Sequence, residues 1–464
     1  MLRRSRAGPP MRRPWPRNPG PATMKFLLDH IEGACVAAFL AICIGLFWPP
    51  DAYFGQANPL AGESNPYHVI AFALLAVLLA GGIVGRFGRF SRLLRGAWPA
   101  LALVALAFIS AFWSEAPELS LRKATTLAET TLFAVYLLTR YELGELVALL
   151  VKLFAFTALA SFAMILAAPD LATAHNISHV TAWRGAFTDK NNLGGVAALA
   201  VLVAIYALYN RLGGRAIAIV ALVLNAVLLY LADSKTPVVA LIAALYVVML
   251  AAAFRQRTGR GLVAGYLVLL VGLAGAAFIA LDFTDALALL GRSPTLTSRT
   301  KIWEVTIGFF QHKPWLGYGY SGFWRQNSVE AYQVQTLLQW PVPSAHNAWI
   351  EQGLWFGWLG IGLFAFVWLV VMRRVWRVLG LPQARHVLFC AALLAFIFIG
   401  LLTESAFFAP AEITWILFAV GIVYLGHEML LARARRTMVP QQRVSGRLVP
   451  AREPAIALSA GRRV

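Results

Sequence analysis

The sequence predicts an all-α, polytopic integral membrane protein with about 12 transmembrane helices and one large loop that contains amphipathic helices. Three observations support this fold class. Of the 464 residues, 59% are hydrophobic and 13% are charged, whereas soluble domains average about 25% charged residues. Apolar segments of roughly 20 residues, the length that crosses a bilayer, recur along most of the chain. Basic residues gather in both tails and in alternate loops, as the selection of membrane topology produces.

The apolar segments divide the chain into three parts. Residues 1–27 form a basic N-terminal tail, residues 28–431 the transmembrane domain, and residues 432–464 a basic C-terminal tail. Both tails are expected to be disordered because they lack apolar content for a core, and Met24 is an alternative start that would make residues 1–23 dispensable. The expected spans are roughly 28–48, 67–85, 97–113, 121–138, 147–168, 192–210, 216–232, 236–254, 261–281, 347–371, 387–403 and 412–431.

The loops between these spans alternate in charge. One set is rich in arginine, from Arg86–Arg95 through Arg140, Arg211 and Arg255 to Arg373–Arg377. The positive-inside rule assigns this set and both termini to the cytoplasm, so the remaining loops face the opposite, non-cytoplasmic side of the membrane. The residues behind the net charge of +19 lie mainly in the two tails and in these alternate loops, so membrane topology accounts for the charge. We therefore expect no nucleic-acid partner.

The large loop, residues 282–346, lies on the expected non-cytoplasmic side. Thr297 or Ser298 is a suitable cap for a helix to about Gln311, and a second helix is expected over 327–338. Pro341 and Pro343 then return the chain to the membrane at His346. The first helix has an apolar side and a polar side, which favours a position at the membrane interface.

Positively charged residues on the non-cytoplasmic face require an explanation, since the positive-inside bias selects against them there. An anionic, lipid-linked substrate is such an explanation. Arginine binds phosphate oxygens in a bidentate manner and stays protonated, so Arg299 is the first candidate for a diphosphate contact. Lys235, in a short hairpin between two spans, is a second candidate, and His346 is a candidate base or acceptor contact. Further candidate substrate-binding residues are Arg184, Lys190, Arg292, Lys301 and Glu404.

Each of these residues also has a purely structural interpretation. Arg299 and Lys235 can contact lipid headgroups, and a lone histidine is more often structural. Trp303, Trp315, Tyr318, Tyr320 and Trp324 can stack on sugar rings, but such residues also populate membrane interfaces. No acidic cluster has the spacing of a metal site, and the three cysteines lie in apolar spans, so we expect no metal and no cofactor.

Several segments, in a fixed order, resemble the signature of the O-antigen ligase and polysaccharide polymerase superfamily, bacterial membrane glycosyltransferases of the GT-C class. The segments are WSEAPELSLRKA (113–124), RGAFTDKNNLGG (184–195), DSKT (233–236), LTSRTKIWE (296–304), KPWLGYGYSGF (313–323) and AHNAWIEQGLWFGWLG (345–360). The stretch LGRSPTLTSRTKIW is most similar to exopolysaccharide polymerases of the succinoglycan type.

The resemblance implies an inverting, metal-independent transfer from an undecaprenyl-diphosphate-linked glycan, at the periplasmic face of the inner membrane of a bacterium. It implies that Lys235 and Arg299 bind the diphosphate and that His346 is the base or an acceptor contact. Lys235 replaces the arginine of many ligases, and Ser298 replaces a glycine of the polymerase pattern. Other implied partners are membrane lipids, a glycan or lipid A-core acceptor, and chain-length regulator and export proteins.

Several functions share these features. The first is polymerisation of lipid-linked repeat units into exopolysaccharide. An O-antigen ligase that transfers glycan to lipid A-core, and a transferase that glycosylates proteins, belong to the same class. A transporter of lipid-linked oligosaccharides is a different class, and it would carry charges along a path through the bundle. Here the expected spans are nearly free of charge and the cations gather at one face, which favours an enzyme.

Overall fold

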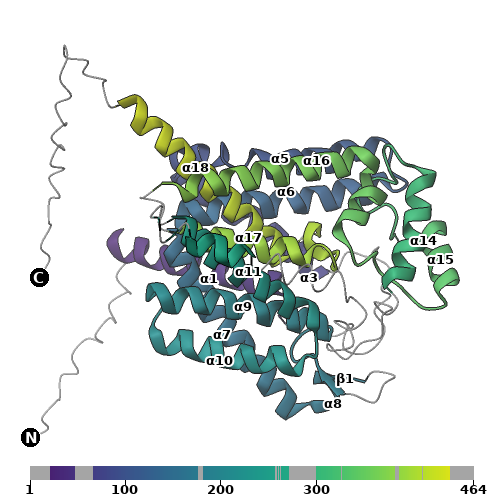
Figure 1. Ribbon diagram of the computed structural model, residues 1–464, viewed down its shortest axis with the longest axis horizontal. Coiled ribbons are helices and arrows are strands. Elements are labelled where there is room, and N and C mark those ends of the chain that lie inside the picture. The colour runs from purple at the N-terminus through teal and green to yellow at the C-terminus, as the bar shows by residue number, and fades with distance from the viewer. Residues whose placement is uncertain are drawn as a thin grey trace, which may run out of the picture.

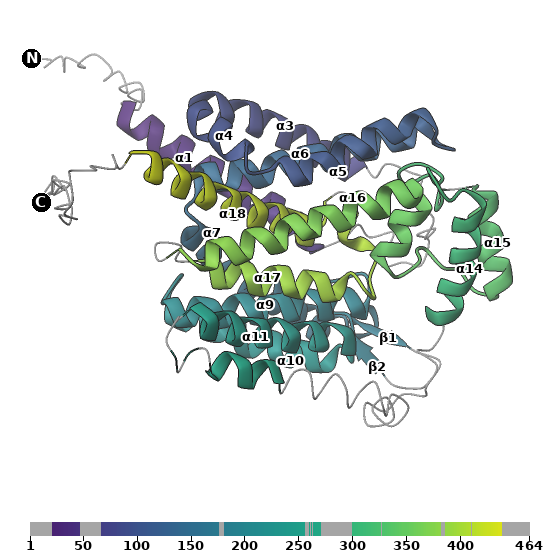
Figure 2. The ribbon, with the colours of Figure 1, turned by 45° about the horizontal axis from the view of Figure 1, so that its top comes forward.

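The protein is a bundle of roughly parallel helices with two shorter helices lying across one of its ends (Figures 1 and 2). The computed structural model describes residues 21–46, 66–175, 181–255, 259, 261, 263–270, 299–325, 327–381, 386–409 and 411–438. Within these residues almost all regular structure is helical, in agreement with the predicted all-α class.

The first half of the chain contributes α1 (Pro21–Ile44), α3 (Pro66–Gly85), α4 (Phe87–Leu94), α5 (Trp98–Ile109), η1 (Ser110–Phe112), α6 (Pro117–Arg140), α7 (Leu143–Ala167), α8 (Pro169–Ala172), β1 (Thr173–His175), β2 (Thr181–Trp183), α9 (Lys190–Asn210), α10 (Arg215–Leu231) and α11 (Lys235–Arg255). The second half contributes α14 (Arg299–His312), α15 (Val329–Leu338), α16 (Ala348–Leu379), α17 (Val387–Gly400), η2 (Ala406–Phe408) and α18 (Ile413–Met438).

Most of the expected spans coincide with a helix. The exception is the ninth, 261–281, most of which lies outside the described residues. Among the described helices, five are long and apolar enough to cross a membrane alone, namely α7, α9, α11, α16 and α18. Helices α3 and α4 form a further candidate span that is bent by 106°. The protein is thus an integral membrane protein with several spans, and the number of about 12 stays a prediction.

Three local features differ from the sequence-based expectations. The arginine-rich stretch after residue 85 is not a plain loop, because α4 forms there and buries Phe90 and Leu93. Strands β1 and β2 form a small antiparallel hairpin, with Ala174 opposite Ala182. Helices α1 and α18 extend to Pro21 and Met438, into stretches assigned to the tails. The remaining tail residues, 1–20 and 439–464, lie outside the described residues.

The core joins the first and last parts of the chain. Helix α18 packs against α6, and α17 packs against α11, so segments far apart in sequence lie side by side. The indole Nε1 of Trp415 donates to Thr131 Oγ1 at 3.0 Å. This bond accounts for one of the threonines that make the fourth expected span polar, since a buried hydroxyl needs a partner.

Candidate functional site

The large loop is fastened to the start of α6 by backbone and side-chain contacts. Trp113 Nε1 donates to the carbonyl oxygen of Leu316 at 2.7 Å, and Ser120 Oγ donates to that of Tyr320 at the same distance. Gly319 has φ of +84°, and a Cβ there would lie 2.3 Å from Cβ of Ser114. Only glycine permits this approach. Two segments about 200 residues apart therefore meet at the same end of the bundle.

An ion cluster strengthens this junction. Glu115 pairs with Lys313, and its second oxygen lies 3.8 Å from Nη2 of Arg325. The hydrogen bond from Lys313 holds the pKa of Glu115 below its usual range. The same ammonium lies 4.7 Å from the centre of the Tyr318 ring. The cations Lys313 and Arg325 are thus engaged in holding the loop in place.

Two of the predicted site residues, Arg299 and His346, meet at the carboxylate of a third, Glu404. Nη2 of Arg299 donates to Oε1 of Glu404 at 2.8 Å. Nδ1 of His346 lies 3.7 Å from Oε2 of the same residue. Arg299 begins α14, His346 precedes α16, and Glu404 follows α17, so each comes from a different element. The three side chains are 19%, 24% and 37% exposed, which leaves them partly accessible to a ligand.

The backbone around His346 is held tightly. His346 has φ of +48°, a conformation that non-glycine residues seldom adopt. Asn347 caps α16 through the amides of Trp349 and Ile350, and its own N–H donates to Ser405 Oγ at 3.0 Å. Such strain persists only where the surroundings enforce it. The contacts therefore fix the backbone from which the imidazole projects.

A buried carboxylate lies beneath this turn. Glu351 is 1% exposed and accepts hydrogen bonds from the Ala345 amide at 2.7 Å and from Trp324 Nε1 at 3.0 Å. Because Ala345 directly precedes His346, Glu351 holds the turn from the inside of the protein.

Replacement of Glu351 by alanine is expected to lower the free energy of unfolding by about 1–3 kcal/mol for each buried donor left without an acceptor. Thermal unfolding of purified protein in detergent measures this loss. Glu304→Ala, which removes an exposed carboxylate on α14, is the matched control and should change little. Equal stability of the two variants would contradict the role of Glu351.

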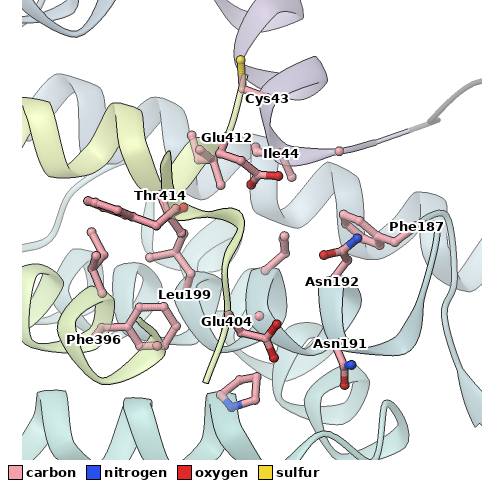
Figure 3. Close-up of a pocket in the computed structure, with 18 of the residues that line it drawn as sticks. Cys43, Ile44, Phe187, Asn191, Asn192, Leu199, Phe396, Glu404, Glu412 and Thr414 are labelled. Atoms are coloured by element: carbon pink, nitrogen blue, oxygen red, sulfur yellow. The ribbon is translucent and has the colours of Figure 1, made fainter. Parts of the chain in front are cut away.

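A cavity of about 310 Å³ adjoins Glu404. It is enclosed by residues of α1, α9, α11, α17 and the start of α18, and Figure 3 shows the carboxylates of Glu404 and Glu412 together with Asn191 and Asn192 around it. Most of its other walls are apolar, such as Phe187, Leu199 and Phe396. A few polar groups in an apolar cavity are typical of a site for a small organic group.

A further part of the cavity wall is formed by the starts of α9 and α11. Asp189 caps α9 by accepting from the amides of Asn191 and Asn192. Asn191 Oδ1 accepts a hydrogen bond from Ser234 Oγ at 3.1 Å, and Lys190 Nζ lies 3.9 Å from Asp233 Oδ2. Lys235 begins α11, next to Thr236 of the cavity wall. Among the described residues, no side chain forms an ion pair with Lys235.

Two other predicted site residues, Arg184 and Lys301, are not among the residues that line this cavity. Arg184 donates to the carbonyl oxygens of Leu171 and Thr188, at 2.7 and 3.2 Å, and so shapes the turn before α9. Lys301 is exposed on α14 and is not a lining residue. Arg292 lies outside the described residues.

The aromatic residues of the large loop are mostly unavailable to a ligand. Tyr318, Tyr320 and Trp324 are at most 5% exposed. Trp303 Nε1 donates to the carbonyl oxygen of Ala345. The rings of Tyr318, Tyr320 and Trp324 are therefore covered by other protein atoms and do not present a face to a sugar. Trp315, which is 73% exposed, is the member whose ring is open to a ligand.

Sequence reasoning missed two carboxylates, Glu351 and Glu412. Burial raises the pKa of Glu412 to about 8, and the negative charge of nearby Asp189 adds to the shift. Glu412 is therefore mainly neutral at pH 7. The available signal was an acidic residue at the outer limit of an apolar segment, since such a residue in a membrane protein is often functional.

Comparisons with known proteins agree with the resemblance seen in the motifs. The sequence profile of the O-antigen ligase family matches residues 220–365. The exopolysaccharide production protein ExoQ of Rhizobium meliloti is 26% identical to this chain over an alignment of 343 residues that covers 66% of this chain and 75% of that protein. The family match includes Lys235, Arg299 and His346 but ends before Glu404.

Proposed function

Because this chain resembles the O-antigen ligase and polymerase superfamily, we propose that it polymerises undecaprenyl-diphosphate-linked oligosaccharides into exopolysaccharide. The observation that carries the proposal is the meeting of Arg299 and His346 at Glu404, beside the cavity. A guanidinium for the diphosphate and an imidazole for a hydroxyl are the groups that glycan transfer from a diphosphate lipid requires. The similarity to an exopolysaccharide production protein gives further support.

In the proposed reaction, Arg299 exchanges Glu404 for the donor diphosphate, which carries more negative charge. Lys235, without an ion-pair partner among the described residues, adds a second positive charge from the start of α11, next to Thr236 of the cavity wall. Both cations stabilise the charge that develops on the leaving undecaprenyl diphosphate, as fixed donors stabilise an oxyanion. In this proposal neither step needs a metal ion.

His346 removes the proton from the acceptor hydroxyl in this scheme. The hydroxyl oxygen attacks the anomeric carbon from the face opposite the diphosphate, and the bond from that carbon to the diphosphate oxygen breaks with inversion. Glu404, released by Arg299, stays next to Nδ1 of His346 and favours the imidazolium that forms. Nε2 is then the nitrogen that accepts the proton. The donor sugar lies in the cavity beside Glu404, Asn191 and Asn192.

The pKa of Glu412 gives the reaction a pH dependence. As the pH rises through about 8 the carboxyl ionises, and a negative charge then faces the cavity that receives an anionic donor. We expect donor affinity to fall between pH 7 and 9 in the wild type, whereas Glu412→Gln, which stays neutral, should lose less. Initial rates at several donor concentrations measure the effect, and identical alkaline profiles would contradict it.

The reaction is proposed to take place at the periplasmic face of the inner membrane, with both termini in the cytoplasm. The support is the alternation of arginine-rich loops. Cysteines at Gln333 on α15 and Arg377 on α16, in a background without the three native cysteines, test this orientation. An impermeant maleimide should label position 333 and not position 377 in intact cells. The reverse result would overturn the orientation but not the chemistry.

An O-antigen ligase is the second candidate, favoured by the description of the family whose profile matches. Purified protein supplied with lipid-linked repeat units distinguishes the two functions. A polymerase releases undecaprenyl diphosphate and yields a ladder of lengthened glycans without another acceptor. A ligase yields product only when lipid A-core is added. If the intact donor instead moves across a vesicle membrane and no diphosphate is released, the protein is a transporter and both enzyme functions are wrong.

A further inference from the structure

A second pocket lies at the end of the bundle opposite to the candidate site. It has a volume of about 410 Å³ and is formed by the corner between α4 and α5, the later part of α16 and the later part of α18. Figures 1 and 2 show the later part of α18 at one end of the bundle, and α14 and α15 across the other. We call it the basic pocket, because four arginines line it: Arg95, Arg373, Arg374 and Arg433.

The charge of this pocket is not balanced by its own walls. Within the part of the chain that the structure describes, no aspartate or glutamate is among the lining residues. Four guanidinium groups around a pocket of this size repel one another unless an anion lies between them. Arginine loops set topology in many membrane proteins, but topology alone does not require four arginines from three separate segments to surround one cavity.

Arg374 is the deepest of the four, with 6% of its surface exposed. Its Nη1 donates to the carbonyl oxygens of Gly96 and Ile422, at 2.6 and 2.8 Å, and its guanidinium lies 5.7 Å from the centre of the Trp98 ring. Its Nε and Nη2 have no acceptor among the described residues. The position of the side chain is therefore fixed from behind, while two donors stay available at the pocket.

The remaining walls are apolar and continue onto the outer surface of the bundle. Phe366, Leu369 and Trp98 line the pocket and are 50%, 69% and 44% exposed. The rings of Trp98 and Phe366 lie 6.2 Å apart. A soluble anion would use the arginines and leave this surface uncovered, whereas an acyl chain would cover it.

We propose that the basic pocket binds an anionic glycerophospholipid, with the phosphate between the four arginines and an acyl chain along Trp98, Phe366 and Leu369. Basic pockets between transmembrane helices are suited to such headgroups. The pocket lies away from Glu404 and its cavity, so the lipid is a structural ligand and not the glycan donor. The proposal does not depend on the reaction proposed above.

Native mass spectrometry of the full-length protein in detergent, with equal amounts of phosphatidylglycerol and phosphatidylcholine, tests this site. The wild type should retain phosphatidylglycerol in preference. The pair Arg373→Gln and Arg433→Gln should lower that preference by on the order of tenfold, since each basic residue near an anionic lipid contributes to binding. Arg377→Gln with Arg435→Gln is the matched control, because it removes two arginines from the same helices outside the pocket.

A further variant and a soluble probe complete the test. Leu430→Glu places a carboxylate on the pocket wall and should also abolish the preference, so the result does not depend on one pair of substitutions. Glycerophosphoglycerol, which has the headgroup but no acyl chains, should compete weakly. Equal loss of phosphatidylglycerol in the pocket and control variants would overturn the proposal, as would full competition by the soluble probe.

Discussion

Replacement of Arg299 by alanine is expected to lower the rate of glycan transfer by about 10²–10³, which corresponds to roughly 3–4 kcal/mol of transition-state stabilisation. Arg299 begins α14 and contacts Glu404 at 2.8 Å, beside the cavity. Arg299→Lys should recover little activity, since one ammonium does not reproduce the bidentate contact of a guanidinium with a diphosphate. Release of undecaprenyl diphosphate by purified variants gives the rates.

The control for this experiment lies two residues further along the same helix. Lys301→Ala removes a positive charge from an exposed position of α14 and should leave the rate within a few-fold of the wild type. Glu404→Gln tests whether Glu404 only shields Arg299 before the donor binds or also favours the imidazolium of His346. If Glu404 only shields Arg299, this variant should bind the donor more tightly. Near-normal product from Arg299→Ala, at normal abundance, would remove Arg299 from the mechanism.

Replacement of His346 by alanine is expected to lower transfer by about 10²–10⁴, the range of general base catalysis, while donor binding is kept. The imidazole lies next to Glu404, and the Asn347 cap holds the strained backbone of His346 in place. His346→Gln separates two roles. An amide does not take up the acceptor proton, so this variant should fail if His346 is the base. Substantial activity would indicate an acceptor contact only.

Parallel assays of transfer and of donor binding are needed for this conclusion. His312→Ala, at the exposed C-terminal end of α14, is the matched control and should behave as the wild type. Full activity of both His346 variants would show that His346 has a structural role and takes no part in catalysis. Loss of donor binding together with transfer would instead indicate that the substitution disturbs the turn between Ala345 and Asn347.

Local patterns in the sequence predicted the helices well. The cap and periodicity near Ser298 predicted α14, and the second helix expected over 327–338 corresponds to α15. Both were predictable because capping and amphipathicity depend on neighbours a few residues apart. Helix α4 was missed because its arginines resemble a cytoplasmic loop, and its burial depends on the elements that it packs against. Hydropathy measures transfer to lipid and does not include such tertiary contacts.

The candidate site was predicted only in part for the same reason. Arg299, His346 and Glu404 were selected one by one from residue type and position, and the structure brings them together. Their shared contact spans 105 residues, which no local pattern reports. The buried tyrosines of the large loop have the composition of a sugar platform, and only packing reveals that they are covered. Glu351 and Glu412 were missed because their roles depend on being buried, and burial is set by tertiary packing that the sequence alone does not show.

The position of Glu404 limits how segments of this protein can be exchanged with those of its relatives. A chimera that exchanges residues 220–365, the segment recognised by the family profile, carries Arg299 and His346 to a new host but leaves their common carboxylate behind. The Asn191 wall of the cavity also remains with the host. A transplant designed to change acceptor choice must therefore include the connection from α17 to α18 and the start of α9. The unit of exchange is set by spatial neighbours, not by the boundaries of sequence similarity.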